Sequence, residues 1–177
     1  MLHEKIHITN SDCGIDINDL SLWKNYTRKS YEVLIQMADV NQVYNVPDKP
    51  GYVYNFLEKY ETYVKGYDYV VTGLLGEMWP IRTGALDGYD VDNISSISCT
   101  PKKIKTKVIG NTYYGICIPV GYEFSVSLSK ETIMHGNAPG VEHLSGDYII
   151  CSSFENGDYR IINGSIFDKM YEVKKSR

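Results

Sequence analysis

The chain carries an internal repeat in which three stretches of its first half match three stretches of its second half, in the same order. The first pair is YTRKSYEVLIQ (26–36) and CTPKKIKTKVI (99–109). Both stretches alternate apolar with polar side chains, which is typical of a half-buried strand. Because a repeated stretch indicates a structural unit used twice, the 177 residues are expected to hold two similar β-rich units.

The second pair, 51–66 and 121–136, bears on whether this part of the chain is helix or strand. Each copy begins with Gly-Tyr and ends with Gly. The first copy alone has apolar residues at helical spacing, namely Val53, Phe56, Leu57, Tyr60 and Val64. The second copy alternates strictly, at Tyr122, Phe124, Val126 and Leu128. If the copies share a fold, both are predicted to be strand–turn–strand.

The third pair is the most specific, and it matches KGYDYVVTGLLGEMWPI (65–81) with SGDYIICSSFENGDYRII (145–162). The Asp-Tyr pair at 68–69 aligns with 147–148, and Gly76-Glu77 aligns with Gly157-Asp158. The pattern predicts a Gly-Asp turn, a strand, a hairpin turn with Gly at positive φ, a second strand and then a short helix.

We therefore predict an all-β or β-dominated α+β fold. It would consist of two similar, strongly bent antiparallel sheet units that arose by internal duplication. The expected parts are an N-terminal segment (1–24), a first β repeat (25–91), a polar link (92–98), a second β repeat (99–173) and a basic tail (174–177). Packing the two units together would bury apolar faces that each small unit cannot cover alone. Exposed strand edges would also allow a homodimer.

The repeated stretches resemble the PGDYG-type module of small bacteriophage and prophage proteins. The residues that carry the resemblance are Arg28-Lys29 with the strand at 31–35, Gly66 to Pro80, Gly146-Asp147-Tyr148, Ser165 to Asp168, and Tyr171-Glu172. The chain departs from the module motif in three ways: Tyr67 is inserted between Gly66 and Asp68, Arg160-Ile161 replaces Trp-Pro, and no Pro precedes either Gly. The resemblance implies phage context and architecture, and it supplies no catalytic residues.

Charge and hydropathy exclude some partners. Lys plus Arg number 18 and Asp plus Glu number 22, so the net charge of −4 argues against general nucleic-acid binding. No apolar run approaches the ~20 residues that cross a bilayer, and the N-terminus lacks a signal-peptide core. We expect no membrane association and a location in the host-cell cytoplasm. The four cysteines (13, 99, 117 and 151) are expected to be separate, largely buried thiols, with two disulfides as an alternative.

We identify no catalytic residues, cofactor motif or metal-ligand spacing in the chain. One alternative is a small metal- or His-dependent hydrolase, whose site would use His135, Glu142, His143 and Cys151. The repeated acids at 68, 77, 147 and 158 fall at predicted turns, where a carboxylate commonly caps backbone N–H groups. The lysines of PKKIKTK (101–107) suit an exposed strand that resists edge pairing, or alternatively a local anion-binding face.

Trp79 and Arg82 are the best candidates for recognition, because Trp and Arg are enriched where partners anchor. The alternative is that Trp79 ends a strand in the core, with a solvated Arg beyond it. The full set of candidate ligand-binding residues is Asp68, Trp79, Arg82, Asp147, Tyr148 and Arg160. A cleft between the copies, lined by some of the 16 tyrosines, would suit a planar phosphorylated ligand.

The sequence thus favours a non-catalytic phage accessory protein that counteracts a host function. It would either sequester a small nucleotide-like ligand or inhibit a host protein. A virion accessory role and the hydrolase remain alternatives.

Overall fold

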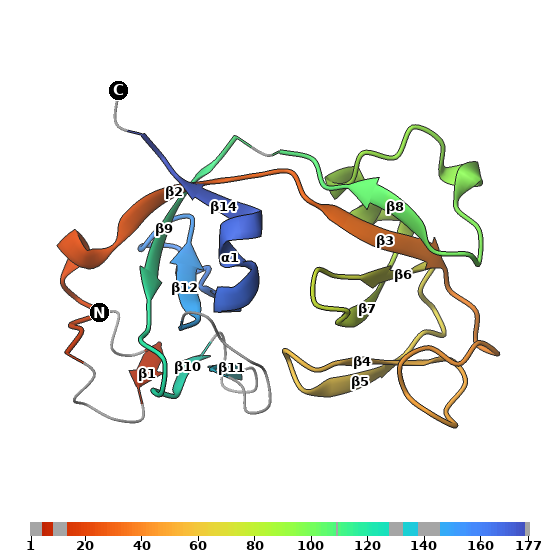
Figure 1. Ribbon diagram of the computed structural model, residues 1–177, viewed down its shortest axis with the longest axis horizontal. Helices are drawn as coiled ribbons and strands as arrows, with labels where there is room; N and C mark the ends of the chain where they lie inside the picture. The colour runs from red at the N-terminus through yellow and green to blue at the C-terminus, as the bar shows by residue number, and fades with distance from the viewer. Residues whose placement is uncertain (1–4, 9–13, 109, 128–132, 138–145, 176–177) are drawn as a thin grey trace. The chain divides into compact units, whose positions relative to one another are not determined.

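The computed structural model describes residues 5–8, 14–108, 110–127, 133–137 and 146–175 (Figure 1). The fold is β-dominated, as predicted, and every strand pairing among the described residues is antiparallel. The chain divides into two compact units. Unit 1 joins Met1–Lys29 with Ile109–Arg177, and unit 2 is Ser30–Val108.

Unit 2 contains six strands and two 3₁₀ helices among its described residues. Their bounds are β3 (Glu32–Met37), β4 (Tyr52–Asn55), β5 (Tyr60–Tyr63), β6 (Tyr69–Thr72), β7 (Met78–Ile81), η3 (Thr83–Gly88), η4 (Ile94–Ser96) and β8 (Lys102–Lys105). Four strands form a sheet in the order β7-β6-β3-β8, and β4 pairs with β5 in a hairpin. The helical spacing in 53–64 therefore belongs to strand–turn–strand, which confirms the prediction drawn from the second copy.

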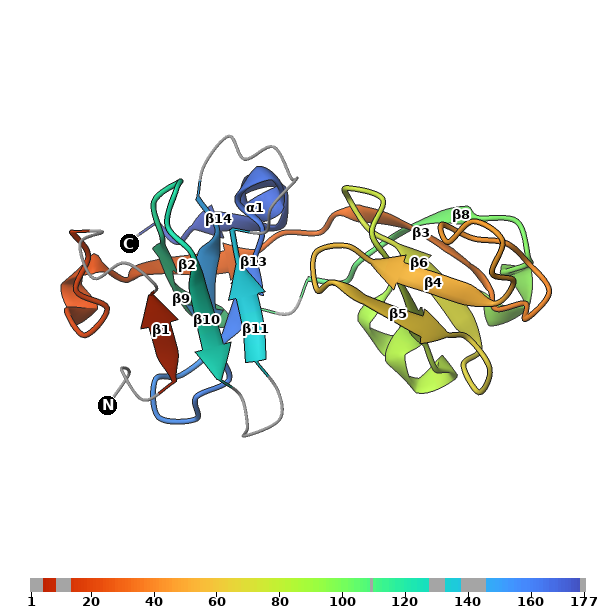
Figure 2. The ribbon, with the colours of Figure 1, turned by 90° about the horizontal axis from the view of Figure 1, so that it is seen from below.

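The four-stranded sheet of unit 2 is covered on both faces, because alternate residues of each strand point to opposite sides. On one face, Ile35 and Val71 pack with Leu86 of η3. On the other face, Val70 packs with Val53 and Val64 of the hairpin region. The hairpin and η3 therefore sandwich the sheet, and Figure 2 shows the hairpin side.

Unit 1 contains eight strands, one 3₁₀ helix and one α-helix among its described residues. Their bounds are β1 (Ile6–Ile8), η2 (Leu20–Leu22), β2 (Lys24–Arg28), β9 (Thr112–Cys117), β10 (Phe124–Ser127), β11 (Ile133–Gly136), β12 (Tyr148–Cys151), β13 (Arg160–Ile162), α1 (Gly164–Met170) and β14 (Tyr171–Val173). Five strands form a sheet in the order β13-β12-β9-β2-β14, and three form a second sheet, β1-β10-β11.

The five-stranded sheet of unit 1 is also covered on both faces. Ile149 of β12 packs with Phe124 and Val126 of the smaller sheet. On the opposite face, Ile150 packs with Tyr26 and with Phe167 of α1. The two units thus share a plan in which a larger sheet lies between a smaller sheet of two or three strands and a short helix. The duplication that would explain this plan stays a prediction.

The division into units differs from the expected ranges 25–91 and 99–173, because strand pairing crosses those boundaries. Strand β2 pairs with β9, and β8 pairs with β3. The two stretches matched first in the repeat therefore meet in one sheet, where Val33 lies opposite Ile104. The N-terminal segment contributes β1 to unit 1. The polar link is part of unit 2, where Ile97 is buried.

The predicted order of hairpin and helix holds in both units. Gly76, between β6 and β7, has φ of +90°, and Gly157, between β12 and β13, has φ of +62°. Both values lie in the left-handed region that favours Gly, as the turn pattern predicted. A short helix follows each hairpin.

One expectation about burial is confirmed and another is corrected. Strand β8 is a sheet edge with its lysines exposed, as expected. The thiols are not uniformly buried: Cys99 is exposed just before β8, Cys117 is half-buried and Cys151 is buried. Cys13 lies outside the described residues.

Candidate functional site

The six predicted ligand-binding residues fall into both units. Asp68, Trp79 and Arg82 belong to unit 2, and the remaining three, Asp147, Tyr148 and Arg160, belong to unit 1. The predicted cleft between the repeats stays a prediction.

Asp68 and Asp147 connect the start of a strand to the start of the helix beyond the next hairpin. Asp68 Oδ2 accepts hydrogen bonds from the N–H and the hydroxyl of Thr83, each at 2.8 Å. Asp147 Oδ1 accepts one from the N–H of Gly164 at 2.9 Å. These matching contacts favour the structural interpretation of both carboxylates.

The two carboxylates differ in exposure. Asp147 is buried, and its second oxygen accepts a hydrogen bond from the N–H of Asn137, whose side chain in turn accepts from the N–H of Asp147. Asp68 is exposed. The hydrogen bonds from Thr83 and the nearby Arg82 guanidinium lower the pKa of Asp68. Asp68 is therefore charged and accessible, whereas Asp147 is engaged inside unit 1.

Tyr148 belongs to an aromatic stack in unit 1. Its ring is parallel to that of Phe167, with the centroids 3.6 Å apart, and it meets Tyr26 edge-on. Burial is the main cause that raises the pKa of Tyr148 to about 12, and the nearby Cys117 side chain is the second. Arg160 is exposed on the edge strand β13, opposite Ile150. The stack gives Tyr148 a packing role that its sequence position alone does not reveal.

Trp79 and Arg82 lie at the end of β7 but face different surroundings. Trp79 is half-buried, lies opposite Val71 and packs against the core beneath η3. Arg82 follows the strand and is exposed at the start of η3. Trp79 therefore packs on the core while Arg82 is exposed beyond the strand, and a role of either residue in recognition stays a prediction.

Arg82 lies beside one exposed tyrosine, Tyr67, and Tyr67 in turn lies near Tyr60. The guanidinium carbon of Arg82 lies 5.9 Å from the ring centroid of Tyr67, within the range of a cation–π interaction. Tyr67 is 36% exposed and Tyr60 is 44% exposed. Burial, then Glu58 and Tyr67 nearby, raise the pKa of Tyr60 to about 12, so its hydroxyl is neutral at physiological pH. We call Tyr60, Tyr67, Asp68 and Arg82 the Arg82 corner.

Sequence reasoning missed Tyr60 and Tyr67. Tyr60 entered only as one of the apolar residues at helical spacing, and Tyr67 only as an insertion into the module motif. That insertion was the available signal, because it puts an aromatic ring directly before Asp68, which recurs in both copies of the repeat. A ring at this position is set on the surface by Gly66, whose φ of +89° turns the chain.

Two residues of the alternative hydrolase site, His135 and Cys151, lie among the described residues. His135 is exposed on β11, opposite Ser125, which lies opposite His7 on the next strand. Cys151 is buried in the core, and burial raises its pKa to about 12. Glu142 and His143 lie outside the described residues. Within the described ranges, no three His, Cys, Asp or Glu side chains are grouped to hold a metal ion.

None of the helices in the described part of the chain combines the length and the apolar character needed to cross a membrane. The chain matches no protein-family model, no curated protein and no solved structure.

Proposed function

We propose that the chain is a non-catalytic binding protein that recognises a partner protein of the host cell through the Arg82 corner. The observation that carries the proposal is the exposed pair of Tyr67 and Arg82, with the guanidinium 5.9 Å from the ring. Tyr and Arg are the residue types most often responsible for binding energy at protein interfaces, together with Trp.

The support beneath the corner favours a preorganised surface. Tyr60 and Tyr67 flank Val64, which is 1% exposed and packs with Val53 and Val70. Thr83, next to Arg82, is tied to Asp68 by two hydrogen bonds. A surface that is ordered before binding loses less conformational entropy when the partner docks.

A protein partner is favoured over a nucleotide by the placement of Trp79. A nucleotide site built on Trp79 and Arg82 would need both side chains on one accessible surface, whereas Trp79 packs on the core. The phage context, and with it the action against a host function in the host cytoplasm, is supported by the resemblance to the PGDYG-type module.

Native mass spectrometry of the full chain, purified from the cells that carry it, tests the proposal. We expect the mass of a complex with one protein, which is then identified and purified for affinity measurements. A retained small molecule of nucleotide mass would instead favour the sequestration mechanism. A bare mass, together with no capture in a reciprocal experiment, would contradict binding.

Two variants locate the surface. The double variant Tyr67→Ala with Arg82→Ala should weaken partner binding by at least tenfold, because hot-spot truncations cost about 2 kcal/mol or more. Arg160→Ala is the matched control, since Arg160 is an exposed arginine beside the corresponding hairpin of unit 1. If Arg160→Ala removes binding and the double variant does not, the recognition surface lies in unit 1.

A further inference from the structure

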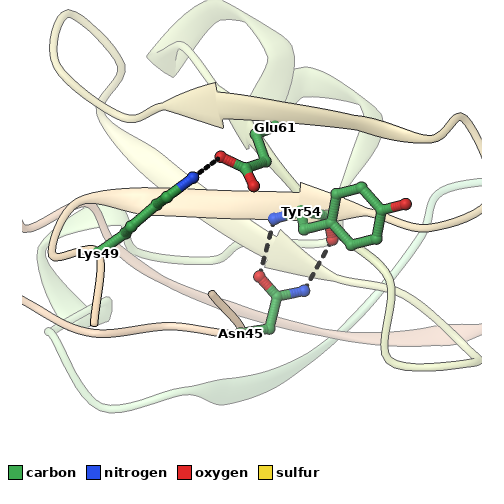
Figure 3. Close-up of polar contacts among 4 residues, drawn as sticks. All are labelled: Asn45, Lys49, Tyr54 and Glu61. Atoms are coloured by element: carbon green, nitrogen blue, oxygen red, sulfur yellow. Dashed lines mark hydrogen bonds and ion pairs between the residues drawn. The ribbon is translucent and has the colours of Figure 1, made fainter. Parts of the chain in front are cut away.

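Unit 2 blocks three of its strand edges with specific side chains. Strand β8 is an edge with three exposed lysines, and the opposite edge, β7, contains Pro80, which has no N–H to offer. The outer edge of β4 is closed by Asn45. As Figure 3 shows, the Asn45 side chain accepts from the N–H of Tyr54 at 2.8 Å and donates to its C=O at 2.7 Å.

Strand β5 is the exception. It pairs with β4 alone among the described residues, and three of its four residues are exposed. In an antiparallel pair, opposite residues alternate between those that bond each other and those that face outward. The backbone N–H and C=O of Tyr54 point away from β5 and bond the Asn45 side chain. Glu61 lies directly opposite Tyr54, so its N–H and C=O also point away from the hairpin. Tyr63, two residues on, does the same.

We infer that the open edge of β5 pairs with β5 of a second copy of this chain, across a twofold axis. The register follows from the outward groups. Glu61 of one copy would exchange hydrogen bonds with Tyr63 of the other, and the symmetry repeats the exchange. In this antiparallel register, the outward N–H and C=O groups of Glu61 and Tyr63 in both copies form four hydrogen bonds. Thr62 then lies opposite Thr62 of the other copy.

Side chains also suit this register. Thr62 facing Thr62 is a favourable cross-strand pair, and Glu61 would lie beside Tyr63 of the other copy. The pairing segment stops at its flanks, because Lys59 has φ of +56° and leaves the extended region. Lys59 and Lys65 border β5, so pairing of two copies brings positive charges close together. Salt screens this repulsion, and the dimer should therefore strengthen as the salt concentration rises. The inference uses Glu61, Thr62 and Tyr63, none of which belongs to the Arg82 corner, although the corner shares Tyr60 with β5.

Cysteine cross-linking tests the register. Thr62→Cys, in a background with Cys13→Ser and Cys99→Ser, should give a 62–62 disulfide-linked dimer on mild oxidation, because Cys99 is the exposed thiol among the described residues. Opposed residues of this non-bonded type have Cα atoms about 4.5 Å apart, which a disulfide can span. Glu61→Cys in the same background is the control and should cross-link poorly, because residue 61 faces residue 63. Equal cross-linking of both variants, or of neither, would overturn the register.

Sedimentation velocity of the full chain tests the main-chain pairing. We expect a concentration-dependent dimer that Glu61→Pro weakens by about tenfold, since it removes two of the four hydrogen bonds across the axis. The proline sits where the N–H faces outward, so the hairpin keeps its own bonds. Glu61→Gln retains the N–H and should dimerise normally. A monomer at every concentration, or equal loss in both variants, contradicts the inference, as does a dimer that only Arg82→Ala disrupts.

Discussion

The carboxylate of Glu77 fills the space that a side chain on Gly73 would need: a Cβ at residue 73 would lie 2.0 Å from Glu77 Oε1. Glu77 is buried inside the β6–β7 turn and accepts a hydrogen bond from the N–H of Leu75 at 2.9 Å. The β12–β13 turn of unit 1 has the opposite combination, a shorter acid with a larger residue at the start of the turn. There the shorter Asp158 accepts from the N–H of the larger Ser152 at 3.0 Å, and also from its hydroxyl. The sizes of the two residues are therefore matched within each turn.

This matching predicts the cost of a side chain at residue 73. Gly73→Ser should lower the free energy of unfolding by about 1–2 kcal/mol, because it displaces the Glu77 carboxylate from backbone donors. Adding Glu77→Asp should recover part of the loss by reproducing the pair found in unit 1. Denaturant unfolding of both single variants and the double variant measures the coupling. Strictly additive effects would show that the two residues are not matched.

The charge of Glu77 predicts a pH dependence of stability. Burial raises the pKa of Glu77 above its ordinary value of 4.5, and hydrogen bonds from the turn only partly oppose this. Above pH 4.5 the folded chain therefore binds more protons than the unfolded chain, so the contribution of Glu77 to stability falls as pH rises through that window. Glu77→Gln should make the free energy of unfolding less dependent on pH there, as measured by denaturant unfolding at a series of pH values.

Asp158 is the control for that experiment, because its shift has the opposite sign. Burial opposes its ionisation, but the hydrogen bonds from Ser152 and Ser153 outweigh burial and lower its pKa below 3.8. Its contribution to stability is present above pH 3.8 and is lost only as pH falls through the lowered value. Asp158→Asn should leave the slope above pH 4.5 unchanged. If both variants alter that slope alike, Glu77 is not its source.

Local sequence patterns predicted the strands and turns of this fold well, but they did not predict which strands pair with each other. Alternation and Gly placement identified the strand–turn–strand of 53–64, the paired strands β10 and β11, and the positive φ of Gly76 and Gly157, whereas Leu128 lies outside the described residues. The choice of β9 as the partner of β2 joins residues far apart in the sequence and depends on the whole core. The alignment of 26–36 with 99–109 matched two alternating strands, and it could not tell equivalent strands from neighbouring ones.

The candidate site shows the same limit. Residue type pointed to Arg82, and its exposure agrees with that choice. Whether an aromatic residue is exposed depends on tertiary neighbours, which is why Tyr67 was missed and why Tyr148 was assigned to binding although it stacks on Phe167. The repeated acids were interpreted correctly as turn carboxylates, because their hydrogen-bond partners lie in the same turn or at the start of the next helix.

The Tyr159 hydroxyl predicts a stabilising substitution. Tyr159 is 2% exposed in the core of unit 1, and its hydroxyl has no hydrogen-bond partner among the described residues. A buried hydroxyl without a partner costs free energy, so Tyr159→Phe should leave the melting temperature unchanged or raise it. Trp23→Phe is the contrast within the same core, because it removes the hydrogen bond from Trp23 Nε1 to the C=O of Ile17, 3.0 Å long. A clear loss of stability in Tyr159→Phe would reveal a partner for the hydroxyl.

Substitutions at Trp79 and at Arg82 should have different effects on stability and on partner binding. Trp79 packs against Val71 and the core beneath η3, so Trp79→Ala should lower the free energy of unfolding by about 2–4 kcal/mol, somewhat less than a fully buried Trp. Arg82 is exposed, so Arg82→Ala should change stability by less than about 0.5 kcal/mol while weakening partner binding. Denaturant unfolding and affinity measurements on the same preparations test both statements. A stable Trp79→Ala variant that has lost binding would return Trp79 to the recognition surface, because its ring would then serve the partner and not the core.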